Sequence, residues 1–197
     1  MSTLKTGALR GTSGTADSIQ LHASDQSVTF PGNVTCSGTA TGFGKLLNYV
    51  VGTPDANQRS TTSATWATAS STCNVSITPS SASSKIAVVC FAEIGCNDGD
   101  DSWNATIFRD IGGTNTNIGD ADAGIASGRS VAGITGLFYP TTMFMIDSPS
   151  TTSACTYQLY VKLRDLDSDS AGNVYINNPA AGNGWHDSWM HVFELAG

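Results

Sequence analysis

The stretch Lys85-Ile-Ala-Val-Val-Cys-Phe-Ala-Glu-Ile94 decides the fold, because it is apolar at both odd and even positions except at Glu93. A β-strand turns successive side chains to opposite faces of its sheet, so this pattern predicts a central strand that is covered on both sides. Packing against a second sheet covers one side. We expect an interface between copies of the chain to cover the other.

Shorter strand-like runs recur on both sides of this stretch, with turn residues between them. In Cys73-Asn-Val-Ser-Ile-Thr78 and Tyr157-Gln-Leu-Tyr-Val-Lys-Leu163, apolar residues alternate with polar or amphipathic ones, which is typical of a strand with one buried face. Further runs are expected at 46–51, beside Trp66, and at 105–108, 131–139, 142–146, 174–176 and 189–195. About ten strands without helices predict an all-β fold, either a β-sandwich or a closed barrel.

The composition excludes several classes of protein. The 197 residues include 24 Ser and 24 Thr but only two Glu and four Lys, so helix-favouring residues are scarce, and a helical bundle or an α/β enzyme is excluded. The net charge is −7 and no basic cluster exceeds two residues, so we expect no nucleic-acid partner. No window of about 18 apolar residues and no apolar leader occur, so we expect neither a membrane span nor a secretion signal.

The first 44 residues differ in character from the rest, and we expect a domain boundary just before Lys45. Three short alternating runs, at 18–21, 27–30 and 33–36, contribute too few apolar side chains for a core of their own. Such a segment is either a flexible tail or buries its apolar face against copies of itself, and the regular alternation favours the second. Residues 1–44 are therefore predicted to be an anchor and β-rich stalk, and residues 45–197 a head domain.

Several stretches resemble segments of bacteriophage fibre and virion-surface proteins, many of them from phages of marine and freshwater bacteria. They are Thr78-Pro-Ser-Ser-Ala-Ser-Ser-Lys-Ile86, Ile146-Asp-Ser-Pro-Ser-Thr-Thr-Ser-Ala154, Val174-Tyr-Ile-Asn177, Phe193-Glu-Leu-Ala-Gly197 and, nearer the N-terminus, Gly32-Asn-Val-Thr-Cys-Ser-Gly38. The resemblance covers nearly the whole chain. It implies a homotrimer in the virion, with a jelly-roll β-sandwich head like those of tumour necrosis factor and complement C1q. It also implies a short intertwined stalk that contacts other virion proteins.

Two acidic loops are candidate cation sites, because Ca²⁺ binds sets of oxygen ligands on flexible loops. A solvated turn explains Asn97-Asp-Gly-Asp-Asp101 better, and Asp165-Leu-Asp-Ser-Asp169 departs from an EF-hand loop at Ser170, where glycine is required. His186 and His191 have no Cys or His cluster beside them, and the five cysteines are not spaced like a zinc site. We therefore predict free thiols, no metal and no cofactor.

Aromatic residues near loops indicate a surface that binds a glycan of the host bacterium. Aromatic rings stack on sugar faces, while neighbouring carboxylate and amide groups bond sugar hydroxyls. The candidate contact residues are Trp103, Asp98, Asp100, Asp101, Trp185 and His186. For Trp103 and Trp185, a place in the core or on the trimer axis is an equal alternative, and for Trp66 and Trp189 the core is favoured.

Catalysis is not expected, because the chain has no Gly-x-Ser-x-Gly, no phosphate-binding loop and only two Glu residues. The sequence predicts a non-enzymatic structural protein of the virion, a trimeric tail fibre whose head attaches to the host surface. One alternative is a capsid-decoration, cement or head-fibre trimer that stabilises the particle. A polysaccharide depolymerase is the other.

Overall fold

The computed structural model describes residues 46–68, 70–97, 101–131, 137–164, 172–177 and 187–197, and the backbone of three short strands before residue 30. Every regular element within these residues is a β-strand, which confirms the all-β prediction. The chain divides into two units, Met1–Gly44 and Lys45–Gly197.

The N-terminal unit contains three short strands, β1 (Ala8–Leu9), β2 (Ile19–Leu21) and β3 (Val28–Thr29). They form an antiparallel sheet in the order β1-β2-β3. The strands β2 and β3 fall on two of the runs expected from the sequence. The third expected run, at 33–36, lies outside the described residues.

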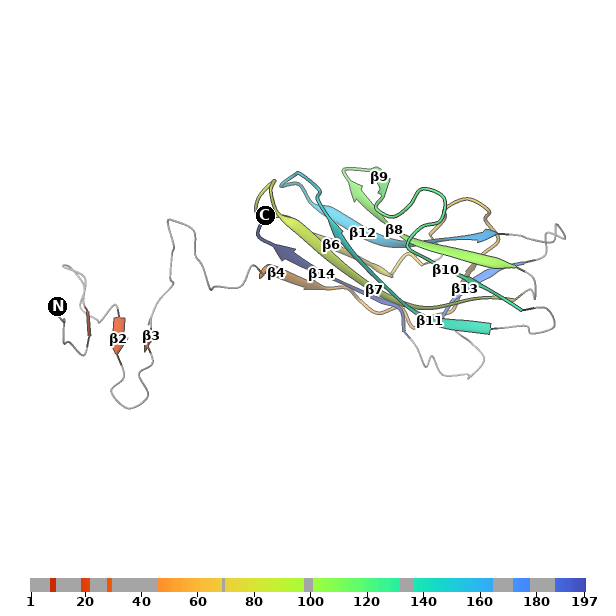
Figure 1. Ribbon diagram of the computed structural model, residues 1–197, viewed down its shortest axis with the longest axis horizontal. Helices are drawn as coiled ribbons and strands as arrows, with labels where there is room; N and C mark the ends of the chain where they lie inside the picture. Colours follow the sequence, from red (N-terminus) through yellow and green to blue (C-terminus); the bar gives the residue numbers. More distant parts are fainter. Residues whose placement is uncertain are drawn as a thin grey trace. The chain divides into compact units, whose positions relative to one another are not determined.

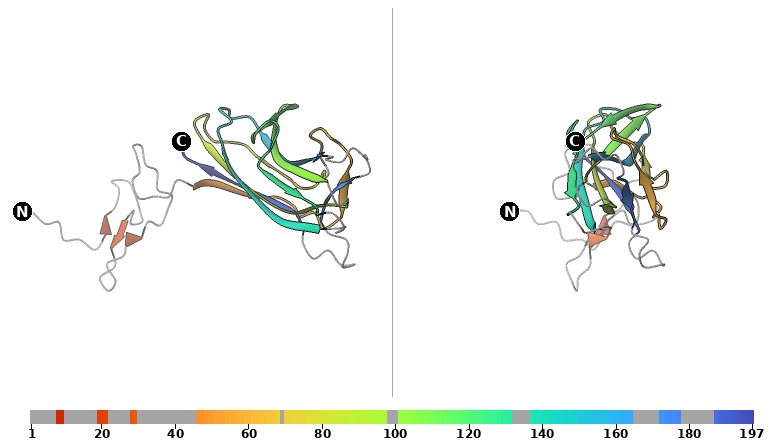
Figure 2. Two further views of the ribbon diagram at one scale, coloured as in Figure 1. Left: turned by 45° about the vertical axis from the view of Figure 1, so that its right-hand side comes forward. Right: turned by 90° about the vertical axis from the view of Figure 1, so that its right-hand side faces the viewer.

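The second unit is a sandwich of two antiparallel sheets, which form two layers in Figures 1 and 2. In the first sheet the order is β4-β14-β7-β13-β5, and β11 also pairs with β7. Its strands are β4 (Leu46–Val51), β5 (Arg59–Thr61), β7 (Lys85–Cys96), β11 (Leu137–Asp147), β13 (Val174–Ile176) and β14 (Trp189–Leu195).

In the second sheet the order is β10-β8-β12-β6, and β9 also pairs with β8. Its strands are β6 (Asn74–Ile77), β8 (Ser102–Ile111), β9 (Thr114–Asn117), β10 (Ala126–Arg129) and β12 (Cys155–Arg164).

The core lies between the two sheets and is made by alternate residues of the long strands. On β7 the inward side chains include Ile86, Val88 and Cys90, and β12 contributes Leu159 and Val161. All five are fully buried. Burying one large aliphatic side chain contributes roughly 1.5–3 kcal/mol, so this core is the main source of the head's stability.

The outer side of β7 is covered only in part within one chain. The structure places β7 at the centre of its sheet, between β14 and β11, as the sequence predicts. Its outward residues Val89 and Phe91 are half-buried by side chains of these neighbouring strands, whereas its inward residues are buried. The second cover that the sequence calls for is therefore incomplete in the single chain.

Glu194 is a buried carboxylate that joins the last strand to the loop between β6 and β7. Its Oε1 accepts hydrogen bonds from the backbone nitrogen and the hydroxyl of Ser80, each at 2.6 Å, and from the hydroxyl of Ser84 at 2.7 Å. Burial raises the pKa of Glu194, but these hydrogen bonds outweigh it, and the net shift of the pKa is downward. The carboxylate therefore stays charged and well bonded inside the fold.

A second, partly buried network joins the two sheets. Arg109 of β8 places Nη1 at 2.8 Å from both carboxylate oxygens of Asp147, at the end of β11. The hydroxyl of Tyr157, on β12, donates a hydrogen bond to Asp147 Oδ2 at 2.8 Å. Burial, together with the neighbouring Asp147 carboxylate, raises the pKa of Tyr157, so its hydroxyl remains a donor.

Candidate functional site

The structure describes two of the six predicted sugar-contact residues, Asp101 and Trp103, and both are buried. The Trp103 residue is 2% exposed, and its ring centroid lies 6.3 Å from that of Tyr139. At Gly128 an added Cβ would come within 2.6 Å of the Trp103 ring, so only glycine at position 128 leaves room for this ring. A buried ring cannot stack on a sugar, so the structure places Trp103 in the core, which was the alternative left open by the sequence.

The other four predicted contact residues, Asp98, Asp100, Trp185 and His186, lie outside the described residues. The same holds for the acidic loop at 165–169.

The core positions expected for Trp66 and Trp189 are not found, because both side chains are half-buried on the outside of the sandwich. Trp189 alternates with the inward residue Met190 on β14, so its ring faces outward. Trp66 donates a hydrogen bond from Nε1 to the carbonyl of Ala121 at 2.8 Å.

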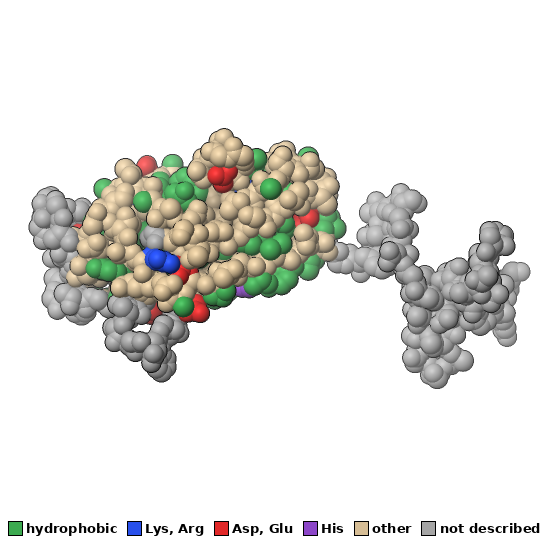
Figure 3. Space-filling model, turned by 180° about the vertical axis from the view of Figure 1, so that it is seen from behind, with side chains coloured by type: hydrophobic (Ala, Val, Ile, Leu, Met, Phe, Trp, Pro, Cys, Tyr) green, Lys and Arg blue, Asp and Glu red, His purple; other side chains and the backbone are tan. Residues whose placement is uncertain are grey.

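The outer side of the first sheet carries a set of apolar side chains, with one histidine among them, that we call the outer apolar face. It consists of outward residues of β4, β7, β11 and β14, namely Leu47, Tyr49, Val51, Val89, Phe91, Phe144, Ile146, Trp189, His191 and Phe193. These strands lie on the lower side of the head in Figure 1, and Figure 3 shows hydrophobic side chains gathered along that side.

Strand pairing makes this face continuous. One row crosses four strands, because Val51 pairs with His191, His191 with Val89, and Val89 with Phe144. Residues that lie directly opposite each other in antiparallel strands place their side chains on the same face of the sheet. A parallel row begins with Tyr49, which pairs with Phe193, and ends at Ile146 on β11.

Ring stacking holds the exposed side chains of the face in place. The ring centroid of Tyr49 lies 4.7 Å from that of Phe193 and 5.9 Å from that of His191, and both pairs are stacked. The Tyr49 hydroxyl lies 3.0 Å from His191 Nδ1. Rings that are ordered before binding lose little entropy on binding, which favours association.

The outer apolar face remains open to water in the single chain. Tyr49 is 47% exposed, Phe144 57% and Ile146 54%. Contiguous exposed apolar patches larger than a few hundred Å² are uncommon on monomeric soluble proteins and mark interaction sites. The doubly apolar pattern of β7 predicted an apolar outer side on that strand, whereas the contributions of β4, β11 and β14 became visible only in the structure.

The outer side of the second sheet carries a cleft that the sequence did not reveal. Arg129, Lys162 and Arg164 line it. Arg129 belongs to β10 and the other two belong to β12, and these strands are brought together only through β8.

The described ranges contain no group of three or more His, Cys, Asp or Glu side chains placed to hold a metal ion. The same ranges contain no helix of the length and apolarity needed to cross a membrane. Four of the cysteines are described, Cys73, Cys90, Cys96 and Cys155, and each is fully buried and is not part of a disulfide.

Comparison of the sequence with protein families and with curated proteins finds no match. Among solved structures, the fold is similar to a chain of infectious bursal disease virus, Gt strain, with a TM-score of 0.41 and 10% identity, over 89% of this chain and 46% of that chain. It is also similar to a chain of the VP2 subviral particle of the same virus, with a TM-score of 0.39 and 11% identity, over 90% of this chain and 42% of that chain. The chain thus spans less than half the length of these viral chains.

Proposed function

We propose that this chain is a non-enzymatic structural protein of a bacteriophage particle, in which three copies associate through the outer apolar face. That face is the observation that carries the proposal. In the single chain Tyr49, Phe144 and Ile146 are each about half exposed. Contact with further copies removes them from water and completes the outer cover of β7, which is favourable because apolar surface is buried.

Charge favours another copy of the chain as the occupant of this face. The chain carries a net charge of −7, so two copies repel each other over much of their surface. Between Lys85 and Glu93, the outward residues of β7 are all uncharged. The rows from Val51 to Phe144 and from Tyr49 to Ile146 contain no carboxylate, so contact between copies meets the least repulsion there.

The proposed particle role and the number of three copies are supported by the resemblance of residues 78–86, 146–154 and 193–197 to phage fibre and virion-surface proteins. In this proposal residues 1–44 join the head to other virion proteins. The head attaches the particle to a glycan on the host cell, as the end of a tail fibre. Three weak sites acting together bind a repetitive surface far more tightly than one does.

Light scattering coupled to size-exclusion chromatography of the full chain tests the assembly. The expected mass is about 61 kDa, three times the 20.4 kDa of one chain. A mass of 20.4 kDa at micromolar concentration contradicts the assembly.

Gold-labelled antibodies raised against the chain test its place on the particle. Label on the tail supports attachment to the host, and in that case purified protein added to the cells beforehand should reduce phage adsorption. Label on the capsid shell assigns the chain to capsid decoration instead. Intact particles without label contradict any role on the virion surface.

A further inference from the structure

Arg129 and Arg164 stand on either side of Ser102 on the outer side of the second sheet. Arg129 of β10 and Arg164 of β12 both pair with Ser102 of β8. Directly opposite residues share a face, and that face is the outer one, because the next residue, Trp103, points into the core. Neighbouring strands are about 4.8 Å apart, so the two arginine Cα atoms are separated by about 10 Å.

A second row runs parallel to the first, two residues further along the strands. Ser127 of β10 and Lys162 of β12 both pair with Asn104 of β8. The two rows form a grid of polar side chains across three strands. Because the strands are hydrogen-bonded to one another, the grid holds its cationic groups on a rigid base.

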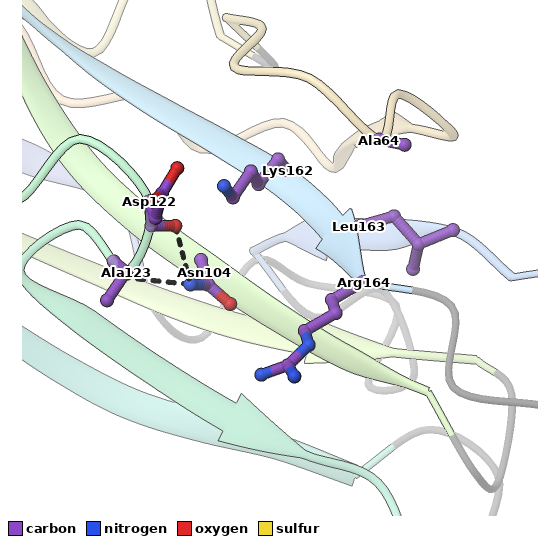
Figure 4. Close-up of a pocket in the computed structure, with 7 residues that line it drawn as sticks. All are labelled: Ala64, Asn104, Asp122, Ala123, Lys162, Leu163 and Arg164. Carbon is purple, nitrogen blue, oxygen red and sulfur yellow. Dashed lines mark hydrogen bonds between the residues drawn. The ribbon is translucent and has the colours of Figure 1, made fainter.

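The grid lines two adjoining hollows, one of which is shown in Figure 4. The first has a volume of about 500 Å³ and is lined by Ala64, Asn104, Asp122, Ala123, Lys162, Leu163 and Arg164. The second has a volume of about 550 Å³ and is lined by Ser102, Asn104, Ala123, Ser127, Gly128, Arg129 and Arg164. Three lining residues are shared, so the hollows form one cleft, with room for a ligand of two or three sugar rings.

The cleft gathers positive charge in an acidic protein. The described residues include six Lys and Arg side chains, and three of them, Arg129, Lys162 and Arg164, line the cleft. Lys162 Nζ lies 4.5 Å from the centre of the Trp66 ring, a cation–π contact that holds the ammonium group at the cleft wall.

Arg164 and Lys162 suit an anionic group on a ligand. Among the described residues, no carboxylate lies within ion-pair distance of Lys162 or Arg164. A guanidinium group binds a carboxylate, sulfate or phosphate through two parallel hydrogen bonds, and such bonds are stronger than those between neutral groups.

The other wall of the cleft suits hydroxyl groups. Asn104 Nδ2 donates hydrogen bonds to the carbonyls of Asp122 at 3.2 Å and Ala123 at 3.0 Å, which fixes this loop over β8. Asp122 is exposed, and its carboxylate accepts bonds from hydroxyl groups but repels a bare anion. A ligand that fits both walls therefore carries an anionic group and several hydroxyl groups.

We propose that this cleft binds an acidic saccharide, with its anionic group against Arg164 and Arg129 and its hydroxyl groups against Asp122 and Asn104. The inference deepens the proposed attachment function, on which it rests, by naming the ligand class and its site. The cleft and the outer apolar face belong to different sheets of the sandwich, so association through that face leaves the cleft open.

Isothermal titration calorimetry with the full chain tests this. The probes are tetragalacturonate and a sulfated tetrasaccharide, with maltotetraose as the neutral chain of equal length and with sodium sulfate and sodium phosphate as free anions. We expect at least one acidic tetrasaccharide to bind with a Kd of about 1 mM or lower, more weakly as salt is added, and maltotetraose not to bind. Arg164→Gln should weaken binding about ten-fold, whereas Lys85→Gln, which removes a cation elsewhere, should not.

The proposal is overturned if neither acidic tetrasaccharide binds, if Arg164→Gln leaves the affinity unchanged, or if the free anions bind as tightly as the saccharides. Circular dichroism and the mass in solution of Arg164→Gln check that its fold and assembly are retained. A trimer that binds no acidic saccharide contradicts this inference alone. A monomer that still binds one contradicts only the proposed assembly.

Discussion

Oε1 of Glu194 lies 2.6 Å from both the backbone nitrogen and the hydroxyl of Ser80, two residues that are 114 positions apart in the chain. The contact joins the end of the last strand to the loop before β7. One buried carboxylate therefore holds the C-terminal strand against the turn that precedes β7.

Replacing this carboxylate should destabilise the head. Glu194→Gln keeps the size of the side chain but removes the charge that strengthens three hydrogen bonds from Ser80 and Ser84. We expect the free energy of unfolding in urea to fall by about 1–3 kcal/mol. Asp122→Asn, at an exposed carboxylate, is the matched control and should change it by less than about 0.5 kcal/mol. Equal effects of the two variants contradict the role given to Glu194.

The same carboxylate should make the fold sensitive to acid. In the folded protein the pKa of Glu194 lies below its ordinary value, so its contribution to stability is present at neutral pH and is lost as the pH falls. The buried Asp55 acts in the same direction. Burial raises its pKa, but hydrogen bonds from Ser70, Thr72 and Arg59 lower it more.

The urea midpoint should therefore fall as the pH drops from about 5 to about 3, through and below the ordinary pKa of a carboxyl group. In Glu194→Gln this fall should be smaller, because the variant has one fewer group to protonate. Parallel curves for the two proteins contradict the assignment.

The outer apolar face should control assembly. Tyr49→Ser and Phe144→Ser each remove an aromatic ring that is about half exposed in the single chain, so they open no cavity in the core. Either change should shift the mass in solution towards the 20.4 kDa of one chain. Val131→Ser removes an apolar residue that is 53% exposed and lies outside this face, and it should leave the assembly intact. The role of this face is contradicted if Val131→Ser shifts the mass in solution, or if neither Tyr49→Ser nor Phe144→Ser shifts it.

Gly128 should be sensitive to the smallest enlargement. An added Cβ at this position comes within 2.6 Å of the Trp103 ring, so Gly128→Ala must displace the ring or the strand. Overpacking of this kind costs about 1–3 kcal/mol, which lowers the melting temperature and changes the tryptophan emission. Ser127→Ala, at the exposed neighbouring position, should do neither. An unaffected Gly128→Ala means that Trp103 is not packed beneath this strand.

Strands with a clear apolar pattern could be predicted from the sequence. The runs expected at 174–176 and 189–195 have the bounds of β13 and β14. In contrast, β9 (Thr114–Asn117) and β10 (Ala126–Arg129) contain almost no apolar side chains, and they become strands because β8 offers them hydrogen-bonding partners. Their pairing is a tertiary effect that a periodic pattern cannot show.

Less of the candidate site could be predicted from the sequence. The sequence shows that Trp103 is aromatic and follows an acidic loop, but only the register of β8 decides that its ring points into the core. The cleft depends on Arg129 and Arg164, which are 35 residues apart and meet through their shared partner Ser102. The apolar stretch that begins at Lys85 predicted a covered central strand more reliably. Its side chains are apolar at both odd and even positions, so both sides of the strand require a cover.

Pro140 has a further consequence. It lies within β11, where the sequence indicated a break between two runs, yet the pairing with β7 continues through it, opposite Glu93. Proline has no N–H group and is tolerated on a strand whose other side is unpaired. The Glu93 carbonyl accepts a hydrogen bond from Asn177 N on the other side of β7, so Glu93 and Pro140 are a non-hydrogen-bonded pair and the Pro140 nitrogen faces away from β7. Within the described residues that side of β11 is unpaired, so a foreign strand docking there would lack one donor midway. Many copies can therefore be held close together without forming fibrils by strand pairing along the β11 edge.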